Sequence, residues 1–334
     1  MVSIGVIGLG FMGSKWARSL AEHSGAQLTL VSDLREDLGR RVAAEWDATY
    51  VVDPLEAASH PKLDGVVIAT SEEAHVELAL AGLEAGNALA VEKPLAHTVE
   101  GARRIRDRAD ELGIPVLAGH ILRFEPRYFA IRRAIESGEI GRVQAIRSER
   151  IGLVSDQDIL GGRTSIALYY GVHEFDIARW YAGDVERIYA ERSSGVLHAR
   201  GFEVEDVYSA TLRFTEGAHG TAMVGWSLPR GTPGWGIAGF TVIGEEAVLR
   251  VTQGEVGYLK VTREGQAHED VHYAPEVGGR LFGPLGIEVD HFVRCVEGTT
   301  SPLCTAADGV EAVRVSLAMV ESAERGEPVK LGAD

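Results

Sequence analysis

In the first 120 residues, short apolar runs alternate with longer stretches in which apolar residues recur at helical spacing. The short runs are typical of strands and the longer stretches of helices. The pattern predicts strands at Ser3–Ile7, Leu28–Val31, Gly65–Ala69, Leu89–Val91 and Pro115–Ala118, and helices at Phe11–His23, Arg35–Trp46, Ala74–Ala85 and Thr98–Leu112. Such alternation favours an α/β domain in which a parallel sheet carries helices on both faces.

The pattern changes near residue 142, where Arg142–Ile151 alternates between apolar and polar positions. A helix is predicted at Ile166–Tyr181, and two more at Glu288–Glu297 and Ala307–Ala323. Further strands are predicted at Val185–Arg192, Val207–Phe214, Gly220–Ser227, Gly239–Ile243, Ala247–Thr252 and Tyr258–Thr262. This density of strands indicates an α+β domain built on a large, mostly antiparallel sheet that is open on one face.

Length and charge narrow the classes of function. With 334 residues, the chain is long enough for roughly two domains at about 150 residues each. Its net charge of −16 argues against binding to nucleic acid or to anionic membranes. No uncharged stretch reaches the about 18 residues that a membrane span needs. The two cysteines, Cys295 and Cys304, are too few for a disulfide framework, so we expect a cytoplasmic protein.

A glycine motif directly follows the first predicted strand. Gly8-Leu9-Gly10-Phe11-Met12-Gly13 fits the pattern G-x-G-x-x-G and leads into a predicted helix. The first glycine allows a tight turn, the second lets the backbone approach a pyrophosphate, and the third permits close packing of helix on strand. We therefore predict that Gly8, Gly10, Phe11, Met12 and Gly13 bind a dinucleotide, whose phosphates lie at the helix N-terminus.

Asp33 follows Gly13 by 20 residues, at the end of the second predicted strand. A carboxylate at this position accepts hydrogen bonds from the adenine-ribose hydroxyls and repels a 2′-phosphate, which favours NAD. Arg35 lies close by and is able to accommodate that phosphate, so NADP stays open as the alternative cofactor.

The turn Glu92-Lys93-Pro94 comes directly after the strand Leu89–Val91. Ligands of open parallel sheets bind at the carboxyl ends of the strands, so Lys93 is predicted to point into the crevice that holds the nicotinamide. The same argument makes Thr70, His75, Glu92 and His120 candidates for lining the cofactor site, because they follow other strands of this sheet.

At this point the chain resembles the glucose–fructose oxidoreductase, inositol dehydrogenase and MocA-like (Gfo/Idh/MocA) family of sugar and cyclitol dehydrogenases. The resemblance spans nearly the whole chain in the right order, and Ala90–Ala96 is its most specific part. The other matching segments are Gly8–Gly13, Asp33, Thr70–His75, Arg123–Pro126, Gly138–Gly141, Gly171–Asp176, Glu205-Asp206 and Gly326–Val329.

The resemblance implies an NAD(P)-binding Rossmann domain at residues 1–122 and a substrate-binding and oligomerisation domain at residues 123–334, with C-terminal helices able to pack back on the first domain. Family substrates are polyols, sugars, cyclitols and their keto forms. By the same resemblance, Lys93 would hold the reacting hydroxyl and His173 would be its acid–base partner. A histidine with a reference pKa near 6.5 suits that role, because the hydroxyl proton must leave while a hydride is transferred.

The sequence departs from the family at Tyr169, where many members carry an aspartate four residues before the histidine. Four residues on a helix put Tyr169 and His173 on one face. A tyrosine is neutral near pH 7 and supplies no carboxylate to raise the pKa of the histidine. Acid–base catalysis is therefore assigned to His173 alone or to His173 and Tyr169 together. A second departure is Ser71-Glu72, where the family often has Pro-Asn.

Other candidates receive weaker roles. Arg163 precedes the helix of His173 and is a candidate for contacting cofactor or substrate. His75, His120 and His173 form no compact ligand motif, so no metal is expected. Trp226 and Trp235 flank a Gly/Pro loop and are either sugar-stacking or packing residues.

Three functions stay open. The first is hydride transfer between NAD(P) and a hydroxyl or keto carbon of a sugar, cyclitol or related polyol. The second is a glycoside lyase or hydrolase that retains NAD and uses transient oxidation, and the third is a non-enzymatic cofactor-sensing regulator. In each case we expect a homodimer or homotetramer formed through the open sheet face.

Overall fold

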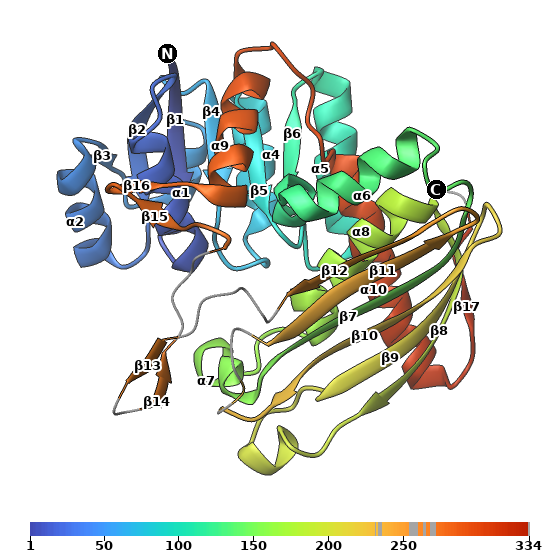
Figure 1. Ribbon diagram of the computed structural model, residues 1–334. Coiled ribbons are helices and arrows are strands. Elements are labelled where there is room, and N and C mark those ends of the chain that lie inside the picture. Colours follow the sequence, from blue (N-terminus) through green and yellow to red (C-terminus); the bar gives the residue numbers. More distant parts are fainter. Residues whose placement is uncertain (231, 233–235, 254–259, 263–264, 268–271, 333–334) are drawn as a thin grey trace. The chain divides into compact units, whose positions relative to one another are not determined.

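The computed structural model describes residues 1–230, 232, 236–253, 260–262, 265–267 and 272–332 (Figure 1). The chain forms two compact units. The first unit combines Met1–Glu125 with His272–Val313, and the second combines Pro126–Val271 with Arg314–Asp334. Compared with the predicted division at residue 122, the first unit ends at Glu125 and also takes in a segment from late in the chain.

The first unit contains a six-stranded parallel sheet in the Rossmann order β3-β2-β1-β4-β5-β6. Its strands are β1 Val2–Ile7, β2 Ala26–Ser32, β3 Thr49–Tyr50, β4 Gly65–Ile68, β5 Ala88–Glu92 and β6 Val116–Gly119. Its helices are α1 Phe11–Ala21, α2 Glu36–Trp46, α3 Pro54–Ala58, α4 His75–Glu84, α5 Val99–Leu112 and α9 Gly283–Val296. The predicted α/β parallel sheet is confirmed, and β3 and α3 are additions to it.

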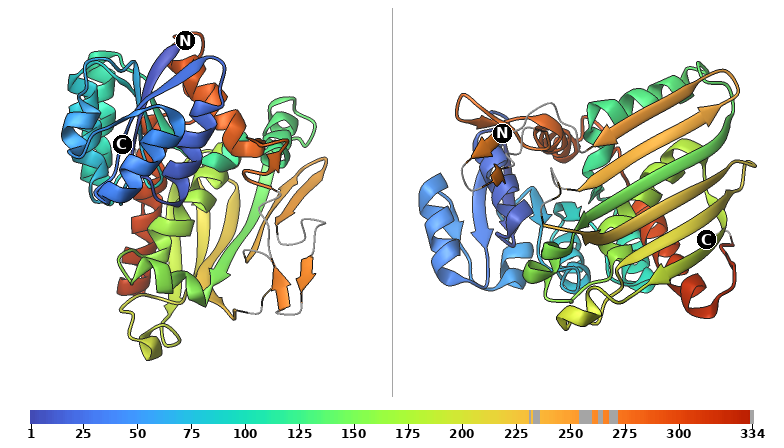
Figure 2. Two further views of the ribbon diagram at one scale, coloured as in Figure 1. Left: turned by 90° about the vertical axis from the view of Figure 1, so that its left-hand side faces the viewer. Right: turned by 60° about the horizontal axis from the view of Figure 1, so that its bottom comes forward.

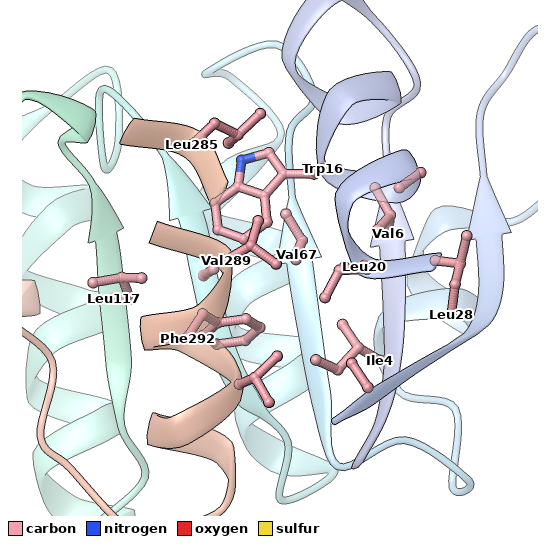
Figure 3. Packing of buried hydrophobic residues seen from close by; sticks show 14 of the residues in the cluster. Ile4, Val6, Trp16, Leu20, Leu28, Val67, Leu117, Leu285, Val289 and Phe292 are labelled. Atoms are coloured by element: carbon pink, nitrogen blue, oxygen red, sulfur yellow. The ribbon is translucent and has the colours of Figure 1, made fainter. Parts of the chain in front are cut away.

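Side chains of each strand alternate between two apolar layers. On β1, Ile4 and Val6 enter one buried cluster while Ile7 enters the other. Helices α1 and α9 (Figure 3) and helix α2 cover the first cluster, and α3, α4, α5 and the start of α10 Ala306–Arg325 cover the second. Both faces of the sheet are therefore buried under helices, as is typical of a parallel sheet with continuous apolar strands.

Residues His272–Val313 join the first unit because helix α9 completes one of these layers. The ring of Phe292 on α9 packs edge-on against Trp16 of α1, with centroids 6.2 Å apart, and both rings are fully buried. Figure 3 shows Leu285, Val289 and Phe292 of α9 facing Trp16, Leu20 and Val67. The polypeptide thus returns to its first sheet after Val271 and then completes the second unit with Arg314–Asp334.

The second unit is built on a seven-stranded sheet in the order β12-β11-β7-β10-β9-β8-β17. Its strands are β7 Val143–Leu153, β8 Val185–Ser193, β9 Val207–Phe214, β10 His219–Leu228, β11 Ile237–Gly244, β12 Val248–Gln253 and β17 Val329–Lys330. Neighbouring strands pair antiparallel except β7 with β10, which pair parallel. The predicted large, mostly antiparallel sheet is confirmed.

The remaining strands lie outside the two large sheets. Lys260–Thr262 (β13) pairs with Gly265–Ala267 (β14) in a two-stranded sheet of its own, so the strand predicted at Tyr258–Thr262 does not extend the large sheet. Tyr258 and Leu259, the first two residues of the predicted strand, lie outside the described residues. Strand β15 Glu276–Val277 pairs with β16 Arg280–Leu281 in the first unit.

Helices cover one face of the seven-stranded sheet. These are α6 Pro126–Glu136, α8 Val172–Ala182 and α10 from Arg314 onward; α7 Gln157–Leu160 is a single turn (Figures 1 and 2). The side chains of β9 alternate strictly: Tyr208, Ala210 and Leu212 are buried, and the residues between them are exposed. In the described residues of this chain, the opposite face carries no helix, so the predicted open face is present.

The helix predicted at Ile166–Tyr181 is present, but its first part is not α-helical, and one further helix of the second unit was not predicted. The helix predicted at Ile166–Tyr181 begins as a π-helical turn at Ala167–Gly171 and becomes α-helical only at Val172. Helix α6 was not predicted at all, although Pro126 at its start is a common first residue of helices. Within the described residues, no helix is both long enough and apolar enough to cross a membrane.

Candidate cofactor and active site

Parallel pairing brings the candidate residues of the first unit to one edge of the sheet. Gly8 follows β1, Thr70 follows β4, Lys93 follows β5 and His120 follows β6. Because β1, β4, β5 and β6 are parallel neighbours, their carboxyl ends lie side by side. The crevice at this edge is where open α/β sheets bind ligands.

The three motif glycines meet different surroundings. Gly8 has a positive φ of 86°, and a Cβ there would lie 2.6 Å from the carbonyl oxygen of Ala69. A Cβ on Gly13 would lie 1.7 Å from the carbonyl oxygen of Gly8. A Cβ on Gly10 would meet no described atom within 4 Å. Gly8 and Gly13 are therefore fixed by the turn and its packing, whereas Gly10 faces open space of the kind that a pyrophosphate needs.

The start of helix α1 favours an anion. Gly10 is its N-cap, and its first turn holds no acidic residue. Phe11 is 61% exposed, and Lys15 places its Nζ 4.6 Å from the centre of the Phe11 ring. Met12 is half-buried. The backbone N–H groups of this turn and the nearby ammonium group suit the phosphates of a dinucleotide, so the residues present fit such a cofactor.

Asp33 binds the glycine loop and Arg35 at once. Its carboxylate accepts hydrogen bonds from the backbone N–H of Leu9 at 2.7 Å and from the Arg35 guanidinium at 3.0 and 3.1 Å. Burial raises the pKa of Asp33, but hydrogen bonds from Arg35 and Leu9 outweigh burial and lower it. Asp33 is therefore a carboxylate near neutral pH. The Arg35 side chain is 60% exposed, so it can leave Asp33 for another anion without unpacking the protein.

His75 lies between the loop after β4 and the turn after β5, which both border the crevice. Its Nδ1 lies 2.9 Å from the carbonyl oxygen of Pro94, and its Nε2 lies 3.3 Å from that of Thr70. The residue is 1% exposed, and burial lowers its pKa despite the opposing effect of these carbonyls and of Glu72. His75 thus ties the loop after β4 to the Glu92-Lys93-Pro94 turn, in which the Lys93–Pro94 peptide bond is cis.

Glu92 binds both helix α1 and the backbone of the Glu92-Lys93-Pro94 turn. Its carboxylate accepts a hydrogen bond from the indole Nε1 of Trp16 at 2.9 Å and one from the backbone N–H of Lys93 at 3.3 Å. Burial raises the pKa of Glu92, and Lys93 opposes this increase. Lys93 is half-buried and directly follows Glu92, the last residue of β5. The lysine therefore lies at the crevice edge of the sheet.

His120 and Arg123, which follow β6, are both buried. His120 follows β6 and is 1% exposed. Arg123 donates to the carbonyl oxygen of Leu303 at 2.8 Å and pairs with Asp308 at 3.1 Å. The ion pair of Arg123 with Asp308 joins the segment after β6 to the start of α10, so the role of Arg123 is structural.

The second unit carries His173, Tyr169 and Arg163. His173 lies in the first turn of α8, is 8% exposed and has a buried Nδ1. Tyr169 lies in the π-helical turn, with its ring centroid 5.6 Å from that of Trp226. The spacing of four residues between Tyr169 and His173 therefore does not run along a regular α-helix, contrary to the sequence-based argument. Arg163 is exposed on the preceding loop.

Glu205 holds the π-helical turn at its start. Its carboxylate accepts hydrogen bonds from the backbone N–H of Ile166 at 2.7 Å and from the hydroxyl of Ser165. Its carbonyl oxygen accepts a bond from the indole N–H of the fully buried Trp226 at 2.7 Å. Trp226 is thus a packing residue rather than a sugar-stacking one, and Trp235 lies outside the described residues.

Sequence reasoning missed three groups that support these residues. Trp16 holds Glu92, and Glu205 holds the turn of Tyr169. Arg150 pairs with the buried Glu174 at 2.6 Å, next to His173 in α8. Trp16 has the local pattern of a core residue, and Arg150 lies on a predicted strand outside the motifs. Glu205 lies in a segment that matches the family, but its contact with Ile166 joins distant positions and no local pattern predicts it.

Both parts of the chain match models of one protein family. A model described as "Oxidoreductase family, NAD-binding Rossmann fold" matches residues 2–120. A model described as "Oxidoreductase family, C-terminal alpha/beta domain" matches residues 132–331. Together the two matches cover most of the chain.

Curated relatives and solved structures agree with these matches. The scyllo-inositol 2-dehydrogenase (NAD(+)) of Bacillus subtilis is 27% identical over 99% of this chain and 96% of its own length. Inositol 2-dehydrogenase 2 of Mycolicibacterium vanbaalenii is 29% identical over 98% of this chain and 94% of its own. A crystal structure of scyllo-inositol dehydrogenase from Lactobacillus casei, with bound NAD(H) and scyllo-inositol, has a TM-score of 0.83 at 19% identity and 99% coverage of each chain. At that identity the structure supports the fold alone.

The glycine geometry separates a folding role from a cofactor role. We expect Gly13→Ala to lower stability by at least about 1–3 kcal/mol, because its new methyl group overlaps the carbonyl of Gly8. We expect Gly10→Ala to unfold at the same temperature as the unchanged protein while binding NAD at least tenfold more weakly. Thermal unfolding and NAD titration by calorimetry measure the two effects. Tight NAD binding by Gly10→Ala would contradict the assignment of the open space to the cofactor.

Proposed function

Because the chain belongs to the Gfo/Idh/MocA oxidoreductase family, we propose that it interconverts a secondary hydroxyl and a ketone on a cyclitol or sugar with NAD. The observation that carries the proposal is the crevice edge of the first sheet. There the open glycine turn follows β1, the carboxylate of Asp33 follows β2 and Lys93 follows β5, all strands of one parallel sheet. The names of the relatives, several of them inositol dehydrogenases, support the substrate class.

NAD, when bound, supplies the acceptor for the hydride that leaves the hydroxyl-bearing carbon. We assign the proton of that hydroxyl to Nε2 of His173, because Nδ1 of this residue is buried. Lys93 donates a hydrogen bond from Nζ to the same hydroxyl oxygen and stabilises the negative charge that grows on it. In the reverse direction His173 returns the proton to the oxygen of the forming alcohol.

Tyr169 changes the environment of this histidine relative to the family pattern. Its ring packs against Tyr170, at a centroid distance of 4.9 Å, and against Trp226. A neutral phenol at this position leaves His173 without the carboxylate that would raise its pKa. We therefore propose His173 as the acid–base residue and Tyr169 as a residue that shapes the substrate side of the site.

Asp33 is proposed to select NAD. Its carboxylate is ionised and would repel a 2′-phosphate, and it pairs with Arg35, the cation that could otherwise accommodate that phosphate. Cys295 and Cys304 are buried and form no disulfide bond, which supports the proposed reduced, cytoplasmic setting.

Cofactor choice tests the pairing of Asp33 with Arg35. We expect the unchanged protein to bind NADH at least tenfold more tightly than NADPH, because a 2′-phosphate would meet the ionised carboxylate of Asp33. Asp33→Ala should narrow that ratio by at least tenfold by removing the repulsion and releasing Arg35. Nicotinamide fluorescence titration measures the dissociation constants of NADH and NADPH for the unchanged protein and for Asp33→Ala.

The control for cofactor choice is Arg40→Ala, which removes an equally exposed arginine paired with Glu36 on the same helix. It should leave the ratio unchanged. Preference of the unchanged protein for NADPH would mean that Arg35 outweighs Asp33.

Loss of Lys93 tests the catalytic assignment. We expect Lys93→Met to lower kcat for the best substrate of a cyclitol and sugar panel by about 100-fold or more, with little change in NAD binding, because the growing oxyanion loses its cationic partner. The rate of NADH formation measures the effect. Lys62→Met, which removes an exposed lysine of the same unit, is the matched control.

Turnover with free NAD also separates this proposal from the other functions. A retained cofactor that never exchanges during net conversion of a glycoside would favour the lyase or hydrolase. Unchanged biological function in Lys93→Met would favour a regulator, since a sensor needs no group for the reacting hydroxyl.

The open sheet face is proposed to form a homodimer or homotetramer. Met223, Ile237, Ile243 and Val248 lie on this face and are each at least 40% exposed. We expect light scattering at micromolar concentration to show an assembly, and Met223→Glu with Ile243→Glu to shift it to monomer by placing charge in an apolar contact. Ile287→Glu, at an exposed apolar residue of the other unit, is the control. A monomeric unchanged protein would refute the proposal.

A further inference from the structure

Tyr50 lies at the edge of the first sheet and reaches the turn that carries Asp33. It is the last residue of β3, the edge strand of that sheet, which lies beside helix α2 (Figure 1). Parallel pairing of β3 with β2 sets Tyr50 opposite Val31, two residues before Asp33. The Tyr50 hydroxyl donates a hydrogen bond to the carbonyl oxygen of Asp33 at 3.0 Å. Tyr50 therefore binds the main chain of the residue whose carboxylate is assigned to the cofactor.

The length and the hydroxyl of a tyrosine both matter at this position. Side chains of strands lean along the strand direction, so a long side chain on β3 reaches the segment that follows the neighbouring β2. A tyrosine hydroxyl is neutral near pH 7 and has a proton to donate to a backbone carbonyl. Phenylalanine fills nearly the same space but leaves the carbonyl of Asp33 without this donor.

The ring of the half-buried Tyr50 is fixed by helix α2, which begins directly after the Asp33 turn. A Cβ on Gly39 would lie 2.1 Å from Cε2 and 2.5 Å from Cδ2 of this ring. Gly39 lies within the helix, and its N–H donates to the carbonyl oxygen of Arg35 at 3.0 Å. Its backbone would accept any side chain, so the space taken by the ring is what requires a glycine here. The Arg40 guanidinium also lies over the ring, 5.3 Å from its centroid.

The carboxylate of Asp33 makes a second set of hydrogen bonds. It accepts the backbone N–H of Leu9 at 2.7 Å and the backbone N–H of Arg35 at 2.8 Å. It also accepts from the Arg35 guanidinium, which belongs to a side chain that is 60% exposed. When a cofactor draws this guanidinium away, the two backbone N–H groups and the Tyr50 hydroxyl still hold Asp33.

We propose that Tyr50 is a positioning residue for the choice of cofactor. Its hydroxyl holds the main chain of Asp33, so that the carboxylate keeps its place at the crevice edge when the Arg35 guanidinium leaves. Gly39 makes room for the ring that carries this hydroxyl. The ribose hydroxyls of NAD then meet an acceptor already in place, and a 2′-phosphate meets a fixed negative charge. The effect on cofactor choice rests on the proposed selection of NAD by Asp33, whereas the hold on the turn does not.

The hold on the turn is tested without any cofactor. In Tyr50→Phe, the backbone N–H groups of Leu9 and Arg35, which both donate to the Asp33 carboxylate, should exchange with solvent faster by about threefold or more, because the turn has lost one bond. Amide hydrogen exchange followed by NMR measures both rates. Tyr189→Phe, which removes the hydroxyl of a tyrosine on β8 of the second unit, should leave them unchanged. Unchanged rates in Tyr50→Phe would overturn the hold.

Cofactor titration tests the positioning role. Tyr50→Phe should bind NADH more weakly than the unchanged protein and narrow its preference for NADH over NADPH by about threefold or more, because the carboxylate is no longer held in place. Tyr189→Phe and Arg40→Ala should keep the ratio, since both leave the Tyr50 hydroxyl and its acceptor intact. An unchanged ratio in Tyr50→Phe would overturn the positioning role even if the exchange rates rise.

The same measurements separate this inference from the proposed function. If the unchanged protein bound NADPH as tightly as NADH, the proposed selection of NAD by Asp33 would fail. The exchange rates of Tyr50→Phe would still decide whether Tyr50 holds the turn.

The role of Gly39 is tested by a double-variant cycle. Gly39→Ala should lower the unfolding temperature, because its methyl group overlaps the Tyr50 ring. In the background of Tyr50→Ala the same change should not lower it, since the ring is gone and alanine favours a helix over glycine. Equal losses in the two backgrounds would overturn the role given to Gly39.

Discussion

Parallel pairing of β1 with β4, of β4 with β5 and of β5 with β6 is the constraint on which the first unit depends. It places four strand ends at one edge, so residues far apart in sequence supply a single crevice. It also requires apolar layers on both faces, because a parallel sheet is buried from both sides. One of these layers needs helix α9, which brings Phe292 against Trp16. The position of the Lys93 turn therefore depends on packing as well as on the strand before it.

Polar groups hold the chemistry-bearing segments in place from within these layers. His75 lies between the carbonyl oxygens of Thr70 and Pro94 and donates its one ring N–H to one of them. Glu92 accepts from the indole of Trp16, and Glu205 holds the turn before His173. Buried polar groups are stable only when they are bonded, so each of them restricts the conformation of its loop. The candidate catalytic side chains are attached to segments that are fixed in this way.

The sequence predicted the first sheet almost completely, because each strand is a short apolar run and each longer helix has an apolar stripe. It missed β3 and α3, which are too short to show a period. It missed the π-helical turn before His173, since Glu205 and Trp226 determine that geometry from distant positions. Of the candidate site, the glycine loop, Asp33 and Lys93 follow from strand-end motifs. The support from Trp16 does not, because its local pattern is that of an ordinary core residue of a helix.

The return of His272–Val313 to the first unit has a consequence for synthesis of the protein. When the first 125 residues have left the ribosome, all six strands of the first sheet are present, but the helix that covers Trp16 is not. That nascent sheet exposes an apolar face while the strands of the second unit are still being made. Its layer closes only after α9 emerges, so the first unit stays incomplete while most of the second unit is made. Chaperones that bind exposed apolar surface would meet this chain during that interval.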